Sequence, residues 1–285
     1  MDSGNSRLKC RAISVDDFTI LGHATIPNDQ IEILESTLAT WTGEFGKASH
    51  VYAVSVASME IRQHIERQVR TLGLTVQWLN VERSALGVEN AYDTQQMGKD
   101  RWYGVLGAYG YNIHIDSKGN QVAVTNKAFL YISFGTATTI DVVVEQQYLG
   151  GVIFPGVQLM QRSLFHGTAQ LPEIHLHEAR AEAFPTNTEK AIESGIVIAQ
   201  AGAVLCQIQR VYEQYQLVPT LYVSGGARYA VMQEIHLTYA HWRTMCHSDV
   251  LPTLQIIELE APVLDGIQAW VESHINQPST AIVFG

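Results

Sequence analysis

Apolar and polar residues alternate in short runs along much of this chain, and such alternation predicts β-strands. The runs are rich in Val, Ile, Thr and aromatic residues and are bounded by Gly, Pro, Ser or Asn, as strands commonly are. The predicted strands cover residues 18–26, 50–57, 74–81, 128–134, 140–148, 220–223 and 254–259. Apolar residues at helical spacing predict helices over residues 30–42, 60–72 and 188–215. Strands that are separated by helices indicate an α/β fold.

The longest predicted helix has a recognisable start. Asn187 or Thr188 is expected to be its N-cap, because the side-chain oxygen of either residue can accept a hydrogen bond from a free N–H group of the first turn. A further helix is expected to begin near Val157. Residues 112–124 contain a polar, glycine-bearing centre between two alternating runs, which predicts an exposed hairpin.

Composition limits the class of protein. With 285 residues and 46% hydrophobic composition, the chain can bury the core of one large domain or two ordinary ones. It has no run of 18 apolar residues and its first twenty residues are rich in charge, so we expect a cytoplasmic protein that does not bind membranes. The formal charge of −10 argues against nucleic acid as a partner. Three widely spaced cysteines, Cys10, Cys206 and Cys246, predict reduced thiols.

Two turns of small residues are candidate phosphate-binding sites. Gly4-Asn5-Ser6 and Gly135-Thr136-Ala137-Thr138 both place hydroxyl groups beside glycine, where backbone N–H groups can approach phosphate oxygens closely. Taken singly, either is more often an ordinary tight turn. The two segments are weakly similar and each precedes a strand-like run, which suggests two halves that hold phosphates in a cleft between them. The boundary is expected between about Leu106 and Lys127.

The segment Gly98-Lys99-Asp100-Arg101 offers a base for phosphoryl transfer. Asp100 could accept the proton of a substrate hydroxyl, and Arg101 could bind an anionic substrate or neutralise developing charge. Asp2 could hold Mg²⁺, directly or through water. The alternatives are a surface ion pair that precedes a helix over residues 102–108 and, for Asp2, a solvated terminal carboxylate. Together with the two turns, these residues indicate a kinase that is not of the Walker type.

Three other features each allow two interpretations. Tyr92 could form the wall of a substrate pocket or simply be half buried. Residues 150–156 and residues 225–227 are glycine-rich and are expected to be tight backbone paths between a strand and a helix. Both segments could line a nucleotide cleft or could be packing turns.

Histidine and cysteine residues in the C-terminal half invite a metal-binding interpretation, which we reject. His175 and His177 have no further ligands nearby in the sequence. His241, Cys246 and His247 do not have the spacing of a structural zinc site. No transition-metal site is therefore expected.

These motifs, in this order, resemble the type III pantothenate kinases, a family that also contains the Bvg accessory factor proteins. The resemblance covers nearly the whole chain. Residues 2–9 resemble the family's opening phosphate motif, residues 98–102 its substrate motif and residues 135–141 its second phosphate motif. Further matches follow in the expected order at Gly150–Gly156, at Asn187-Thr188 with Ser194-Gly195, and at Gly225-Gly226-Ala227.

The resemblance implies a fold and an activity. The fold would be the duplicated actin-like, ribonuclease H-like α/β ATPase fold of the acetate and sugar kinase, Hsp70 and actin superfamily, with a nucleotide cleft between two lobes. The N-terminal lobe would cover residues 1–115, and the C-terminal lobe, residues 116–285, would carry the dimer interface. The activity would be ATP-dependent phosphorylation of pantothenate to 4′-phosphopantothenate, the first step of coenzyme A synthesis. A homodimer would use Mg²⁺ and a monovalent cation, K⁺ or NH₄⁺.

The resemblance also implies the roles of individual residues. Asp100 would be the proton acceptor. The residues that would bind ATP are Asp2, Ser3, Gly4, Asn5, Ser6, Arg7, Leu8, Lys9 and Thr136. Those that would bind pantothenate are Tyr92, Gly98, Lys99, Asp100, Arg101 and Thr188. Asp2 would hold Mg²⁺, and Ser133 stands at the monovalent-cation position.

Three features depart from the family pattern. Only Met1 precedes Asp2, so we expect a short first strand that frays. Ser133 stands where many members have a K⁺-binding Asp, and the segment from Tyr92 to Gly98 lacks the usual proline and is about one residue shorter. These departures leave two alternatives open: a catalytically weak member with a regulatory or accessory role, and a kinase for another small hydroxy acid.

Overall fold

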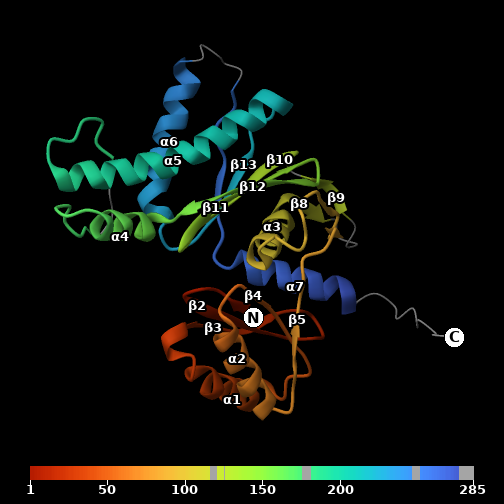
Figure 1. The fold of residues 1–285 in the computed structure, drawn as a ribbon. Helices are drawn as coiled ribbons and strands as arrows, with labels where there is room; N and C mark the ends of the chain where they lie inside the picture. The colour runs from red at the N-terminus through yellow and green to blue at the C-terminus, as the bar shows by residue number, and fades with distance from the viewer. Residues whose placement is uncertain (116–120, 125, 175–180, 246–250, 276–285) are drawn as a thin grey trace. The chain divides into compact units, whose positions relative to one another are not determined.

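The structure is a computed structural model, which describes residues 1–115, 121–124, 126–174, 181–245 and 251–275 (Figure 1). The chain divides into two compact units. Unit 1 comprises residues 1–111 and 261–285, and unit 2 comprises residues 112–260. The C-terminal helix thus belongs to the same unit as the N-terminal sheet, whereas the sequence placed it in a C-terminal lobe.

Unit 1 contains a five-stranded sheet with the order β3-β2-β1-β4-β5. The strands are β1 (Asp2–Ser3), β2 (Arg7–Ile13), β3 (Ile20–Pro27), β4 (Val51–Ser55) and β5 (Val76–Trp78). Strand β1 is antiparallel to β2 and parallel to β4. Helices α1 (Ile33–Phe45) and α2 (Met59–Thr71) bury Leu34 and Ile65 against Leu8 of β2 and so form the core of this sheet.

Two further helices of unit 1, α3 (Lys99–Asn112) and α7 (Pro262–Ile275), approach each other at glycine residues. A Cβ atom on Gly107 would lie 2.0 Å from the Pro262 carbonyl oxygen. A Cβ atom on Gly266 would lie 1.9 Å from the Tyr103 carbonyl oxygen. Neither position has room for a side chain. Because both residues are glycine, the two helix backbones can pack in direct contact.

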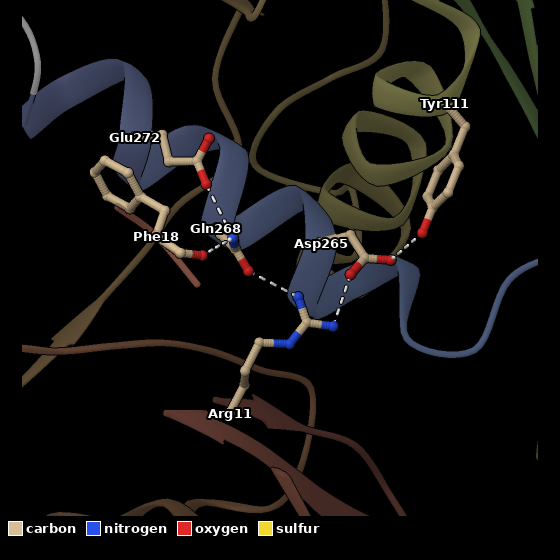
Figure 2. A network of polar contacts seen from close by, with 6 residues as sticks. All are labelled: Arg11, Phe18, Tyr111, Asp265, Gln268 and Glu272. Carbon is tan, nitrogen blue, oxygen red and sulfur yellow. Dashed lines mark hydrogen bonds and ion pairs between the residues drawn. The ribbon is translucent and has the colours of Figure 1, made fainter. Parts of the chain in front are cut away.

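A polar network joins α7 to β2 and α3 (Figure 2). Arg11 donates from Nη2 to Asp265 Oδ1 at 2.7 Å and from Nη1 to Gln268 Oε1 at 2.9 Å. The Tyr111 hydroxyl donates to Asp265 Oδ2 at 3.4 Å, and Gln268 Nε2 donates to the Phe18 carbonyl at 3.0 Å. The side chains of Arg11 and Asp265 are only 12% and 22% exposed, so their ion pair is partly protected from screening and helps to hold α7 on the sheet.

Unit 2 contributes five neighbouring strands, in the order β14-β13-β10-β11-β12, to the larger sheet. They are β10 (Ala128–Phe134), β11 (Ala137–Val144), β12 (Gln147–Pro155), β13 (Thr220–Ser224) and β14 (Ile256–Glu258). Strands β10, β11 and β12 are antiparallel neighbours, and β13 runs parallel to β10 and β14. Helices α4 (Val157–Gly167), α5 (Thr188–Tyr215) and α6 (Arg228–Met245) contribute to its apolar core.

Helix α5 is long and apolar enough to cross a membrane when judged by length and composition alone. However, 56% of its most apolar window is buried inside the protein. Val204 and Ile208 of this helix are fully buried in the core of unit 2. Since the core helix of a soluble protein passes the same test, α5 is only weak evidence for a membrane span.

Most of the predicted elements are confirmed. Residues 128–134 and 188–215 match β10 and α5 residue for residue, and residues 60–72 match α2 within one residue. Asn187 is the N-cap of α5, and its side chain accepts a hydrogen bond from Lys190 N at 2.9 Å. The predicted hairpin is present as the antiparallel strands β8 (Ile113–Ile115) and β9 (Gln121–Val124), and its centre lies outside the described residues.

Other predictions are wrong. The single strand expected over residues 140–148 spans the end of β11, a turn and the start of β12. Glu145 and Gln146 make this turn with positive φ angles of 47° and 70°, which non-glycine residues rarely adopt. Gly150, expected in a strand-to-helix path, lies inside β12 beside a register shift, with φ 109°. Strand β2 and helix α6 were expected only without bounds, as a strand-like run after the first turn and a helix after residues 225–227, and helix α7 was not predicted.

Candidate active site

The first candidate phosphate turn connects β1 to β2 in unit 1. Ser3 and Leu8 are paired across this hairpin, and Gly4 N–H donates to the Arg7 carbonyl at 3.0 Å to close the turn. Asn5 and Ser6 are exposed, as is Arg7. The turn therefore presents backbone and side-chain donors on the surface of unit 1, as a phosphate site requires.

Strand β1 has two residues but is paired on both sides. Asp2 and Ser3 face β2 on one side and β4 on the other. Val54 N–H donates to the Met1 carbonyl at 3.0 Å, and Val56 N–H donates to the Ser3 carbonyl at 3.0 Å. The strand that we expected to fray is thus held inside the sheet.

Asn28 supports the first turn and was not predicted from the sequence. Its side-chain Nδ2 donates to the carbonyl oxygens of Gly4 at 3.0 Å and Asn5 at 2.9 Å. Its backbone N–H donates to the Ser6 carbonyl at 3.0 Å. One residue thus fixes three consecutive carbonyl groups of the turn. The only sequence signal was an Asn after Pro27, which marks turns in general.

Asp2 and Asp100 provide the two carboxylates of the predicted site, and both lie in unit 1. Desolvation raises the pKa of Asp2 to about 6. The positive charge of Lys9 opposes this shift, whereas the negative charge of Asp100 adds to it. The two carboxylates are therefore close enough to interact electrostatically. Paired acids with raised pKa values are typical of catalytic sites.

Asp100 lies in the first turn of α3, where its Oδ1 accepts a hydrogen bond from Arg101 N at 2.9 Å. Desolvation raises the pKa of Asp100, against the opposing effects of the Arg101 backbone N–H and charge. Gly98 leaves space for this carboxylate, because a Cβ atom there would lie 2.6 Å from Asp100 Oδ1. Lys99 is half buried, and desolvation together with the charge of Arg62 lowers its pKa. The segment thus combines a half-buried acid with cationic neighbours.

Tyr92 and Arg101 lie against each other beside this acid. The Arg101 guanidinium, in a residue that is only 4% exposed, lies 5.5 Å from the centre of the Tyr92 ring. The loop that carries Tyr92 follows the hairpin β6 (Ser84–Ala85) and β7 (Val88–Asn90). The buried Asn90 accepts from Tyr92 N at 3.0 Å and donates to the Glu82 carbonyl at 3.0 Å. Asn90 therefore fixes the position of Tyr92, a role that the sequence did not reveal.

The second candidate phosphate turn connects β10 to β11 in unit 2. Phe134 and Thr138 are paired across the hairpin, and Gly135 N–H donates to the Ala137 carbonyl at 3.1 Å. Gly135 and Thr136 are exposed. Gly225 packs directly beneath, since a Cβ atom there would lie 2.3 Å from the Phe134 carbonyl oxygen. The 225–227 segment is thus a close-packed support for this turn.

The two other predicted residues of unit 2 lie at strand and helix ends. Ser133 is half buried near the end of β10, where it pairs with Thr139 and Ser224, both of which also carry hydroxyl groups. Thr188 is exposed and is the first residue of α5. Leu8, which the resemblance placed among the ATP-binding residues, is fully buried in unit 1, so its side chain packs in the core.

No group of three or more His, Cys, Asp or Glu residues that could hold a metal ion occurs among the described residues. His241 lies in α6, whereas His175, His177, Cys246 and His247 lie outside the residues that the structure describes. Asp2 is therefore the candidate for a Mg²⁺ ligand. Mg²⁺ is commonly held by one or two carboxylates together with water and substrate phosphates, and a single acid beside a phosphate turn fits this pattern.

Comparison with known protein sequences assigns a family resemblance to most of the chain. The family model described as "Type III pantothenate kinase" matches residues 1–210. The chain is 34% identical over 270 residues to a type III pantothenate kinase from Bordetella petrii, with 94% of each sequence covered. It is 32% identical over 273 residues to the corresponding protein of Bordetella pertussis, with 94% of this chain and 95% of that protein covered.

Solved structures with low sequence identity share the fold. A Baf family protein of Campylobacter jejuni, described as a transcriptional activator, is similar with a TM-score of 0.52 and 16% identity, over 97% of this chain and 98% of that chain. A ROK family glucokinase from Streptomyces griseus, solved with glucose and AMPPNP, has a TM-score of 0.50 and 10% identity over 95% and 97%. The α/β architecture of this chain is therefore shared with these solved structures.

Proposed function

The chain belongs to the type III pantothenate kinase family, and on that premise we propose how its residues phosphorylate pantothenate. The reaction transfers the γ-phosphoryl group of ATP to a hydroxyl group of pantothenate and opens coenzyme A biosynthesis. One observation supports the residue assignment above all others: Asp2 and Asp100 lie in the same unit, and the negative charge of Asp100 contributes to the raised pKa of Asp2. Two interacting acids can divide the tasks of metal binding and proton transfer.

We assign proton transfer to Asp100. As the hydroxyl oxygen of pantothenate forms a bond to the γ-phosphorus, its proton passes to the Asp100 carboxylate and ADP leaves. The raised pKa of Asp100 suits this role, because a general base works best when its pKa approaches the operating pH. We assign to Arg101, which lies against the Tyr92 ring, the binding of the pantothenate carboxylate.

We assign Mg²⁺ to Asp2, the first residue of the two-residue strand β1 that leads into the first turn. The Ser3 hydroxyl is buried and has no hydrogen-bond partner among the described residues, so the end of this strand keeps an unused polar atom as well as the acid. When bound there, Mg²⁺ would neutralise charge on the β- and γ-phosphates. Asp2 must be ionised to hold the ion.

We assign ATP to the two turns and pantothenate to the segment around Asp100. The ATP-binding residues would be Asp2–Lys9, with Leu8 contributing only its backbone, and Thr136. The pantothenate-binding residues would be Tyr92, Gly98–Arg101 and Thr188. The exposed polar groups of both turns and the cationic neighbours of Asp100 support this division.

We further propose a cytoplasmic homodimer that responds weakly to monovalent cations. Cys10 and Cys206 are free thiols, which suits a reducing compartment. Ser133 and its neighbours Thr139 and Ser224 offer neutral hydroxyl oxygens, which hold K⁺ or NH₄⁺ less tightly than a carboxylate does. We therefore expect cation stimulation to be small compared with relatives that have an acid at this position.

Replacement of Asp100 by Asn tests the assigned base. We expect kcat to fall by about 10²–10⁴-fold in a coupled assay for ADP, because the amide cannot accept the proton. Asp16→Asn is the matched control, since it removes one negative charge from an exposed loop position and should leave turnover unchanged. Near-normal turnover of the Asp100→Asn protein, with a native circular dichroism spectrum, would reject the assignment.

A further inference from the structure

Gln200 has a side chain that is buried completely and is hydrogen-bonded at both ends. It lies in α5 and is 0% exposed. Its Oε1 accepts a hydrogen bond from the Thr138 hydroxyl at 2.7 Å. Its Nε2 donates to the Pro155 carbonyl at 2.8 Å and lies 3.1 Å from Met160 Sδ. A buried amide is costly unless it is paired, and this one is paired with two specific groups.

The two main partners of Gln200 flank the second phosphate turn. Thr138 is the first residue of β11 that pairs back onto β10, directly after the turn. Pro155 pairs with Ala137 and is followed by Gly156, whose N–H donates to the Thr136 carbonyl at 3.1 Å. The Gln200 amide therefore joins the two strand ends between which the Gly135–Ala137 backbone is held.

The contact beneath the turn leaves little freedom for adjustment. A Cβ atom on Gly156 would lie 2.3 Å from the Gly135 carbonyl oxygen and 2.7 Å from the Thr136 carbonyl oxygen. The turn therefore rests directly on the Gly156 backbone. A shift of Pro155 relative to Thr138 would move Gly156 and change the orientation of the backbone N–H groups of the turn.

We propose that Gln200 is a positioning residue for ATP, which fixes the geometry of the second phosphate turn through Thr138 and Pro155. The inference rests on the proposed function, in which this turn binds ATP. A neutral amide suits the task because it accepts at one end and donates at the other without placing a charge in the core. Gln200 itself is buried behind the turn and acts on the nucleotide only through its two partners.

Replacement of Gln200 by Leu keeps the volume and removes both hydrogen bonds. We expect KM for ATP to rise about tenfold, since one or two hydrogen bonds that orient the turn are lost. The values of kcat and of KM for pantothenate should stay within about twofold of wild type, because Asp100 and Arg101 belong to unit 1. Gln207→Leu is the matched control, since Gln207 is also a buried glutamine of α5 and lies two turns further along the helix.

Direct nucleotide binding separates failure of this inference from failure of the proposed function. Calorimetric titration with AMPPNP and Mg²⁺ should give about tenfold weaker binding to Gln200→Leu than to wild type or Gln207→Leu, whether or not pantothenate is the acceptor. Equal binding by the three proteins would overturn the positioning role. If Gln200→Leu does not fold, Thr138→Val decides, because it removes only the hydroxyl partner and should weaken AMPPNP binding while pantothenate binding is retained.

Discussion

At the scale of single residues, the proposed Mg²⁺ role of Asp2 makes a prediction about pH, because the pKa of this residue is raised. Burial raises this pKa from 3.8 to about 6, and Mg²⁺ must displace the proton because it binds the carboxylate form. We predict that the Mg²⁺ concentration needed for half-maximal activity rises as the pH is lowered from 7.5 to 5.5. Steady-state rates over a Mg²⁺ series at each pH measure this directly. A requirement that does not change with pH would contradict the metal role of Asp2.

The variant Asp2→Asn gives an independent check through stability. The pKa of Asp2 is higher in the folded than in the unfolded state, so its charged form destabilises the fold fully above about pH 6 and progressively less as the pH falls toward 3.8. Asp2→Asn should therefore raise the Tm of the protein without nucleotide more at pH 7.5 than at pH 5. Thermal melts of both proteins at the two pH values supply the comparison, and Asp16→Asn controls for net charge.

The residues proposed to act directly in phosphoryl transfer were easier to predict from the sequence than the residues that support them. Asp2, Asp100 and the two glycine turns could be singled out because carboxylates and glycine-rich turns suit phosphoryl transfer wherever they occur. Asn28 and Gln200 could not, because the groups that their side chains bind lie 23 or more residues away along the chain. A buried amide has no sequence signature. Its role depends on which carbonyl and hydroxyl groups the fold places beside it.

At the scale of elements, β1 is shorter than the strands on either side of it. The Met1 nitrogen donates to the Tyr52 carbonyl of β4 at 2.7 Å, and beyond this bond residues 11–13 of β2 and Val51 of β4 have no strand partner on their β1 side among the described residues. An apolar groove of about 500 Å³ lies at this place in unit 1. Its walls include Ile13, Leu38, Trp41, Phe45, Ile267 and Val271. Strand edges with unpaired backbone groups beside an apolar groove can accept one more extended segment.

We predict that three apolar residues added before Met1, such as Val-Leu-Ile, would stabilise the protein by continuing β1. They would pair with β2 and β4 and bury their side chains in the groove, with a net gain of about 2 kcal/mol after the cost of ordering them. Thermal melts should show Tm raised by roughly 4–8 °C. Gly-Ser-Gly at the same place is the control, since it adds length without apolar surface. Equal Tm values for the two extended proteins would show that the groove does not accept a strand.

The elements that could be predicted are those with a strong period or a clear cap. Helix α5 has both, and its bounds were predicted to the residue. The turn at Glu145 and Gln146 was missed because both residues adopt positive φ without glycine or asparagine to signal it. Helix α7 was missed for a different reason: Gly266 meets the Tyr103 backbone, and a glycine within a helical pattern lowers helix propensity in the sequence while permitting this contact in the fold.

At the scale of the whole molecule, a tight hairpin turn that begins with glycine occurs in each unit. Gly4 and Gly135 each donate a backbone hydrogen bond that closes a short turn between antiparallel strands. The weak sequence similarity between the two segments therefore corresponds to a similar local structure, as a duplicated kinase fold would have. The supports differ: the Asn28 side chain braces the first turn, and Gly156 with Gln200 braces the second. Each turn can thus be tested by its own variant.

The family resemblance implies that the pantothenate pocket is completed across a subunit interface, and this gives a prediction for the assembled protein. The chain has a mass of 31.6 kDa, so sedimentation should show a species of about twice that mass at micromolar concentration. Because each site would need both subunits, specific activity should fall on dilution in parallel with dissociation of the dimer. Inert albumin added at each dilution controls for loss of the protein by adsorption to surfaces. Full specific activity in samples that sediment at 31.6 kDa would show instead that one subunit contains a complete site.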